Sequence, residues 1–179
     1  MFRNIISTGF TILLAAVLSG CSDKETRTNK KGTDMIFTGA NGEVVLMTVA
    51  PGHFHAGLLQ KTMYDRGSPT AYVYAPEGSG VEVHLKRIED YNSRADNPTC
   101  WEEIVYTGPD YFEKMLGEKP GNVMIVSGNN RKKTEYIKQA VDNGINVFSD
   151  KPMCIDRKGF ELLEKAFESA DEKGVLLYD

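Results

Sequence analysis

The side chains most able to do chemistry follow a short apolar segment in the second half of the chain. Asp150, Lys151 and Pro152 come directly after residues 145–148 and Ser149. A lysine that is partly desolvated in a cleft can have a lowered pKa and can hydrogen-bond a hydroxyl group that is being oxidised. The alternative interpretation is a surface lysine that pairs with Asp150. The segment therefore predicts either a reactive lysine or a simple ion pair.

A second candidate loop lies between an apolar segment and a helical pattern. A dinucleotide-binding fold places a glycine-rich turn here, so that backbone N–H groups meet the pyrophosphate at a helix N-terminus. Gly52 and Gly57 are present, but the complete G-x-G-x-x-G pattern is absent. The alternative is a plain turn in which Gly52 has a strained backbone angle. The candidate cofactor-binding residues of this loop are Pro51, Gly52, His53, Phe54 and His55.

His53 and His55 are also candidates for metal binding. At the start of a helix, however, side chains at positions i and i+2 point in different directions. The neighbouring sequence offers no third ligand of the kind that a zinc site needs. We therefore expect no metal site. Each histidine is interpreted as a neutral side chain near the pyrophosphate, or as one packed beside the first strand.

Two further groups of polar residues follow apolar segments. Glu77 lies 25 positions after Gly52, where a carboxylate could accept hydrogen bonds from the hydroxyls of an adenosine ribose. The alternative is a solvated turn residue, because Pro76 and Gly78 flank it. The second group, after residues 123–126, consists of Ser127, Gly128, Asn129 and Asn130.

Strands and helices must alternate along the chain to position these loops. Nearly continuous apolar runs predict strands at residues 44–49, 70–74, 104–106, 123–126, 145–148 and 175–178. Helical spacing predicts helices at residues 54–63 and 111–116, after Asn130 and after Asp156, with a short helix between Pro76 and Trp101. This alternation indicates an α/β fold, a Rossmann-like, doubly wound, mostly parallel sheet with helices on both faces. Ligands bind such sheets beyond the carboxyl ends of the strands.

Specific residues are expected to begin and end the helices. The side chain of Asn129 or Asn130 can cap one helix N-terminus, and that of Asp156 can cap another. Helix ends are expected at Gly117, Gly144 and Gly174, because glycine adopts the left-handed conformation that closes many helices.

The N-terminal residues have the pattern of an export signal. Arg3 is followed by an apolar run over residues 5–18, shorter than the roughly 20 residues that a membrane-spanning helix needs. Leu18-Ser19-Gly20-Cys21 resembles a bacterial lipobox, in which Cys21 becomes the lipidated first residue; an ordinary signal peptide is the alternative. We expect a signal peptide over residues 1–21, a polar tether over residues 22–34 and one domain over residues 35–179. The expected location is a bacterial cell envelope, periplasmic or surface-exposed.

Charge and cysteine content restrict the partners. A net charge of −4 gives no reason to expect nucleic acid. Cys100 and Cys154 could pair in an oxidising compartment. We interpret them instead as small buried residues that do not pair, because the two lie far apart in sequence, and no spacing suggests a metal site.

Residues 143–153 resemble a segment of the glucose-fructose oxidoreductase and inositol dehydrogenase family (Gfo/Idh/MocA). That family carries G-k-h-V-l-x-E-K-P, where this chain has Asp150 in place of the usual Glu, followed by Lys151 and Pro152. Ser127-Gly128-Asn129-Asn130 stands where the family has a T-P-N turn. Gly52-x-x-His55 resembles the end of its G-x-x-G-x-x-H signature. The resemblance covers about residues 44–179. The chain departs from the family pattern in lacking its first glycines and a histidine early in the helix after Asn130.

The resemblance implies an NAD or NADP cofactor, with NAD favoured, and a sugar, polyol or glycoside as substrate. It places Lys151 between nicotinamide and substrate as the catalytic residue, Pro152 in a cis peptide bond, and Asp150 among the cofactor-binding residues. An exported enzyme would have to carry its cofactor tightly and recycle it, which favours redox-neutral or glycosidase-like chemistry. Members of the family also have a second α/β domain for the substrate, which we expect to be missing here, and a homo-oligomer is compatible with the resemblance. The alternative function is a non-catalytic envelope lipoprotein that uses the fold as a binding or scaffolding module.

Overall fold

The computed structural model describes residues 37–179. The predicted signal peptide, the lipobox at Cys21 and the polar tether lie outside these residues. In the described part of the chain, every helix is too short or too polar to cross a lipid bilayer.

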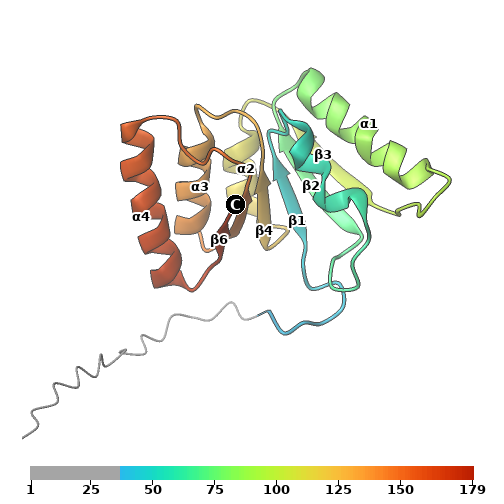
Figure 1. The fold of residues 1–179 in the computed structure, drawn as a ribbon, viewed down its shortest axis with the longest axis horizontal. Coiled ribbons are helices and arrows are strands. Elements are labelled where there is room, and N and C mark those ends of the chain that lie inside the picture. The colour runs from blue at the N-terminus through green and yellow to red at the C-terminus, as the bar shows by residue number, and fades with distance from the viewer. Residues whose placement is uncertain (1–36) are drawn as a thin grey trace, which may run out of the picture. The chain divides into compact units, whose positions relative to one another are not determined.

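Six parallel strands form one sheet, as the sequence predicts (Figure 1). Their order across the sheet is β3-β2-β1-β4-β5-β6, so the chain reverses its direction of progress between β1 and β4. In such a sheet the loops after β1 and β4 run to opposite sides and leave a crevice between them. The strands are β1 (Leu46–Val49), β2 (Thr70–Ala75), β3 (Glu102–Thr107), β4 (Val123–Val126), β5 (Asn146–Ser149) and β6 (Leu177–Tyr178).

Helices cover both faces of the sheet (Figure 1). On one side lie α2 (Tyr111–Glu118), α3 (Lys133–Asp142) and α4 (Arg157–Lys173). On the other lie α1 (Ser79–Ser93) and two short 3₁₀ helices, η1 (Phe54–Gly57) and η2 (Leu59–Lys61). A helix between Pro76 and Trp101 is therefore confirmed, but the expected short length is wrong, because α1 has 15 residues.

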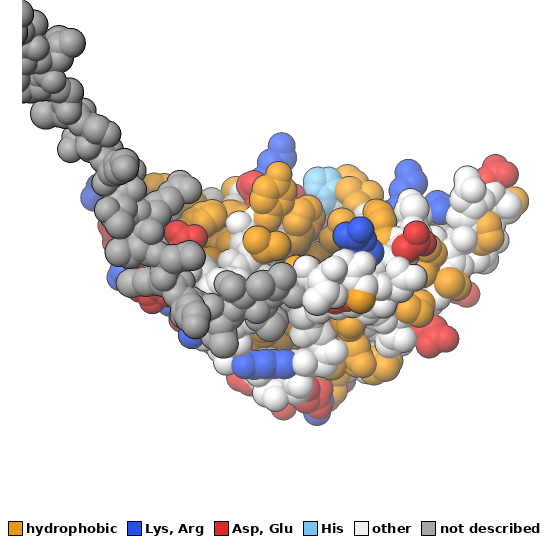
Figure 2. Space-filling view, turned by 90° about the horizontal axis from the view of Figure 1, so that it is seen from below, with side chains coloured by type: hydrophobic (Ala, Val, Ile, Leu, Met, Phe, Trp, Pro, Cys, Tyr) orange, Lys and Arg blue, Asp and Glu red, His pale blue; other side chains and the backbone are white. Residues whose placement is uncertain are grey.

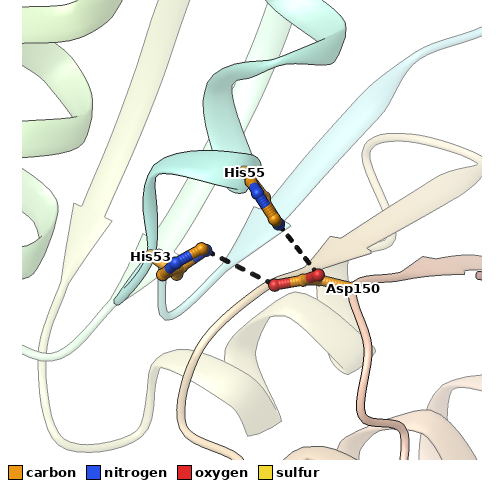
Figure 3. A group of neighbouring side chains, drawn as sticks. All are labelled: His53, His55 and Asp150. Carbon is orange, nitrogen blue, oxygen red and sulfur yellow. Dashed lines mark hydrogen bonds and ion pairs between the residues drawn. The ribbon is translucent and has the colours of Figure 1, made fainter.

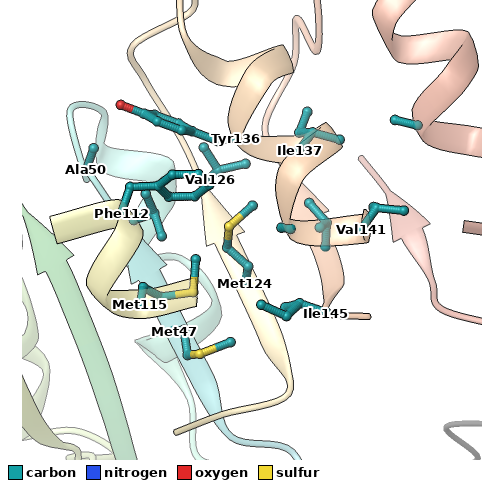
Figure 4. Close-up of a cluster of buried hydrophobic side chains, with 14 of the residues drawn as sticks. Met47, Ala50, Phe112, Met115, Met124, Val126, Tyr136, Ile137, Val141 and Ile145 are labelled. Atoms are coloured by element: carbon teal, nitrogen blue, oxygen red, sulfur yellow. The ribbon is translucent and has the colours of Figure 1, made fainter. Parts of the chain in front are cut away.

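Strand β1 is buried on both faces, which explains its continuous apolar run. Met47 belongs to the buried cluster on the side of α2 and α3, which also includes Met115 and Ile137 (Figure 4). Leu46 points the opposite way and packs with Ile88 of α1. The alternation along the strand therefore sends its side chains into separate clusters on the two faces of the sheet.

The predicted helix over residues 54–63 is wrong. Its apolar residues do not form a buried stripe, because Phe54 is 49% exposed and Leu58 is 44% exposed. Gly57 instead packs closely on α1, where an added Cβ would lie 2.9 Å from Cδ of Arg87. This close approach places two 3₁₀ turns where the spacing predicted an α-helix.

The predicted helix ends are partly confirmed. Oδ1 of Asp156 accepts a hydrogen bond from the backbone N of Gly159 at 2.7 Å, as a capping residue does. Gly144 (φ 75°) and Gly174 (φ 67°) are left-handed, as expected. The predicted side-chain cap at Asn129 or Asn130 is wrong, because α3 begins at Lys133 without a side-chain cap. Similarly, α2 ends at a left-handed Lys119 and not at Gly117.

Side chains of several kinds remain at the surface. Cys100 is exposed, Cys154 is half-buried and both thiols are free, so the interpretation of Cys100 as a buried residue is wrong. Hydrophobic side chains also reach the surface, with a histidine side chain among them (Figure 2). Exposed apolar residues near the end of the described chain include Leu176 and Tyr178.

Candidate functional site

Three loops meet at the carboxyl edge of the sheet, as the sequence predicts. They follow β1, β4 and β5. The backbone N of Gly52, after β1, donates a hydrogen bond to the carbonyl oxygen of Ser127, after β4, at 3.1 Å. The backbone N of Asp150, after β5, donates to the carbonyl oxygen of Val126 at 2.9 Å. Backbone hydrogen bonds therefore connect the three loops directly.

Gly52 and Gly128 touch backbone to backbone. A Cβ added to Gly128 would lie 2.9 Å from Cα of Gly52, and Gly128 has a φ of +89°. Glycine is thus required at position 128 both by the backbone conformation and by the contact. The expected strained angle at Gly52 is wrong, since the positive φ values fall on Ala50 (43°), Gly128 and Asn129 (43°).

A cavity of about 330 Å³ opens beside this contact, between the loops after β1 and β2. Its lining includes Pro51, Gly52, Asn129 and the exposed Glu77. The structure therefore places Glu77 across a hollow from the glycine turn, in an exposed position that fits either a ribose contact or a solvated turn residue.

Asp150 is the centre of a polar cluster (Figure 3). Nδ1 of His55 donates to Oδ1 of Asp150 at 2.9 Å, and Nδ1 of His53 lies 3.5 Å from Oδ2. Oγ of Ser127 donates to Oδ2 at 3.0 Å. The two histidines thus point at the same carboxylate, contrary to the expectation that they point in different directions.

The pKa of Asp150 lies below its ordinary value. Burial by itself raises this pKa, but the hydrogen bonds from His55 and Ser127 and the charges of His55 and Lys133 outweigh that effect. The carboxylate is therefore ionised at neutral pH and accepts hydrogen bonds from its neighbours.

Lys151 is exposed and lines a different cavity, of about 480 Å³, together with His55, Phe148 and Asp150. Among residues 37–179 the ion pairs of Asp150 are those with His53 and His55, so the structure does not support a Lys151–Asp150 pair. The peptide bond between Lys151 and Pro152 is cis, as the family resemblance implies. Pro152 is exposed, as is Asn130.

Two buried ionisable residues escaped the sequence analysis. Lys133 is fully buried and its Nζ donates to the carbonyl oxygen of Asp150 at 2.7 Å. Burial lowers the pKa of Lys133, and the charge of Asp150 acts in the opposite direction. Lys133 precedes Tyr136 and Ile137 at helical spacing, so its place on a buried stripe could have been found.

His84 of α1 is the second such residue. It is 4% exposed, and its Nε2 has no hydrogen-bond partner within the described residues. Burial, together with the charge of Arg87, lowers the pKa of His84 to about 4. It lines a cavity of about 210 Å³ that also includes Gly52 and His53. His84 shares helical spacing with the buried Val81 and Ile88, which was the available signal.

The chain is similar to proteins of one family. The sequence model of an oxidoreductase family with an NAD-binding Rossmann fold (Gfo/Idh/MocA) matches residues 71–178. A solved protein assigned as an oxidoreductase, from Parabacteroides merdae, is 62% identical with a TM-score of 0.79, over 80% of this chain and 33% of that protein. No curated protein matches the chain.

More distant structures share the fold. Biliverdin reductase from Synechocystis, solved with biliverdin and NADP⁺, is 11% identical with a TM-score of 0.54, over 76% of this chain and 37% of its own. The WlbA dehydrogenase from Chromobacterium violaceum, solved with NADH and UDP-GlcNAcA, is 15% identical with a TM-score of 0.52. The match covers 81% of this chain and 37% of that dehydrogenase. The chain thus spans about a third of the length of the structures that it matches.

Gly128→Ala is expected to lower the free energy of unfolding by about 3 kcal/mol, because a Cβ there is strained by the positive φ and collides with Gly52. Urea denaturation would measure the loss. Gly117→Ala is the matched control, since a Cβ at this helical position meets nothing within 4 Å and should change stability by less than about 1 kcal/mol. Equal stabilities of the two variants would contradict the proposed importance of the glycine contact.

Proposed function

Because this chain belongs to the Gfo/Idh/MocA family of oxidoreductases, with an NAD-binding Rossmann fold, we propose that it is the nucleotide-binding part of an enzyme that oxidises a sugar, polyol or glycoside. The observation that carries the proposal is the convergence of the Gly52, Gly128 and Asp150 loops at the point where the sheet reverses its strand order. Such a crevice is where dinucleotides bind in open α/β sheets.

The cavity between Gly52 and Glu77 suits the adenosine half of the dinucleotide. Its glycine backbone lets a phosphate approach closely, since no side chain intervenes. The Glu77 carboxylate would accept hydrogen bonds from the ribose hydroxyls and would repel a 2′-phosphate. This charge favours NAD over NADP.

Lys151 is the proposed catalytic residue. The carboxylate of Asp150 contacts His53, His55 and Ser127. The ammonium group of Lys151 therefore does not pair with that carboxylate. Lys151 lines the cavity of about 480 Å³, where its side-chain nitrogen could hydrogen-bond a substrate hydroxyl and, as the neutral amine, accept the proton of that hydroxyl. A bound nicotinamide would supply the acceptor for the hydride that leaves the substrate carbon bearing this hydroxyl.

One structural neighbour supports the proposed substrate class. A structural neighbour was solved with a sugar nucleotide, UDP-GlcNAcA, and with NADH. The match with this chain covers only 33% to 37% of these structures, so the complete reaction is proposed for a protein that also holds the remaining length. Exposed apolar side chains such as Leu176 and Tyr178 offer a surface for a substrate domain or for a second copy of the chain.

A non-catalytic binding module remains the second candidate. The turn after β1 lacks the complete glycine pattern and leads into η1, a four-residue 3₁₀ helix, in place of a long α-helix. A pyrophosphate at this turn therefore gains little from a helix dipole. Absence of NAD binding would favour the module.

Isothermal titration of the purified chain with NAD is expected to show one weak site per chain. Glu77→Gln should weaken NAD binding roughly tenfold, because a charge-assisted hydrogen bond contributes about 1.5 kcal/mol or more, and should weaken NADP binding less. Glu89→Gln, at an exposed position of α1, is the matched control and should bind NAD normally. A chain that takes up no NAD, or a Glu77→Gln variant with unchanged affinity, would contradict this assignment.

Lys151→Ala is expected to lower kcat at least 100-fold in any longer form of the protein that turns over a sugar or polyol, with NAD affinity retained. Lys158→Ala, at an exposed position of α4, should leave kcat unchanged. Steady-state kinetics of each variant would measure kcat. Near-normal turnover by Lys151→Ala would remove this lysine from the mechanism.

We also propose that the protein is exported and anchored by a lipid on Cys21. The support is the sequence alone, since this residue lies outside the described part of the chain. The full chain expressed in bacteria should sediment with membranes, and Cys21→Ser should release it. Cys100→Ser is the control and should stay with the membranes. Recovery of the parent chain in the soluble fraction would refute the anchor.

A further inference from the structure

His53, His55 and Asp150 together form a candidate ligand set for a metal ion. Each offers one ligand atom, and the three atoms lie within 4.8 Å of one another. The two histidines come from the loop after β1, and Asp150 comes from the loop after β5 (Figure 3). The fold thus supplies the third ligand whose absence from the neighbouring sequence led us to expect no metal site.

The distances are close to those of a bound cation. With metal–ligand bonds of about 2.1 Å at tetrahedral angles, two ligand atoms lie about 3.4 Å apart. Nδ1 of His53 is 3.5 Å from Oδ2 of Asp150, whereas His55 faces the other oxygen, so one ion would be held by both carboxylate oxygens or by a carboxylate turned toward it. Nδ1 of His55 is 2.9 Å from Oδ1, a hydrogen-bond distance that must widen by about 0.5 Å when a cation replaces the shared proton.

The carboxylate is held in place by its surroundings. Oγ of Ser127 donates to Oδ2 of Asp150 at 3.0 Å, and Nζ of Lys133 donates to the backbone oxygen of Asp150 at 2.7 Å. Hydrogen bonds of this kind orient the ligands of metal sites and typically affect metal affinity 10- to 100-fold. The Asp150 carboxylate is therefore already oriented in the metal-free protein.

We propose that His53, His55 and Asp150 bind a divalent transition-metal cation. Two imidazoles and one carboxylate form a donor set that suits Zn²⁺. The side chains are accessible to an ion from solvent, since His53 is 44% exposed and His55 is 34% exposed. Three protein ligands leave a coordination position open, and the cavity that His55, Asp150 and Lys151 line could supply an oxygen ligand to it.

Titration of the full chain with zinc chloride, without dinucleotide, tests the proposal separately from the proposed function. Calorimetry is expected to show one Zn²⁺ per chain. His53→Gln, His55→Gln and Asp150→Asn should each lower the affinity at least tenfold. A Cys100→Ser, Cys154→Ser double variant controls for binding by thiols and should retain the parent affinity.

A second measurement uses the parent chain and does not depend on the folding of variants. The ring nitrogen resonances of His53 and His55 should shift on addition of Zn²⁺, whereas those of the buried His84 should not. No saturable binding, unchanged affinity in the three ligand variants, loss of binding in the cysteine variant, or unshifted His53 and His55 resonances would each overturn the proposal.

Discussion

The hydrogen bonds of the Asp150 carboxylate hold the candidate site together. They join the loop after β1, through His55, to the loop after β4, through Ser127, and Nδ1 of His53 also lies 3.5 Å from the carboxylate. A partly buried carboxylate destabilises the folded state unless it is paired and hydrogen-bonded. The ionised Asp150 side chain therefore depends on these partners. Without Asp150 the two histidines would have no common partner, and the loop after β1 would lose its side-chain connection to β5.

The sheet creates the setting for this interaction. Because the strand order reverses between β1 and β4, their loops diverge and leave a crevice that side chains from several loops can line. Gly52 and Gly128 bring the two backbones into contact at the base of this crevice. Backbone contact replaces side-chain packing there, which leaves space above the sheet edge for a ligand.

Neighbouring residues after β5 have opposite roles because successive side chains of an extended chain point to opposite sides. Asp150 turns into the cluster, where its side chain is 13% exposed, whereas Lys151 is exposed beside the largest of the cavities described above. The acid can therefore organise the loops while the lysine stays available to a substrate. The one-residue offset separates the carboxylate that joins the loops from the lysine that we propose as the catalytic residue.

The sequence by itself determined the order of strands and helices, the parallel sheet, and helix ends at Asp156, Gly144 and Gly174. These features depend on local patterns, namely continuous apolar runs, helical spacing and the backbone preferences of a few residues. Only the tertiary structure decided that residues 54–61 form 3₁₀ turns and that His53 and His55 face Asp150, 95 positions after His55. Contacts between distant segments depend on the order of the strands in the sheet and on how closely the loops approach one another. A local sequence pattern predicts neither of these.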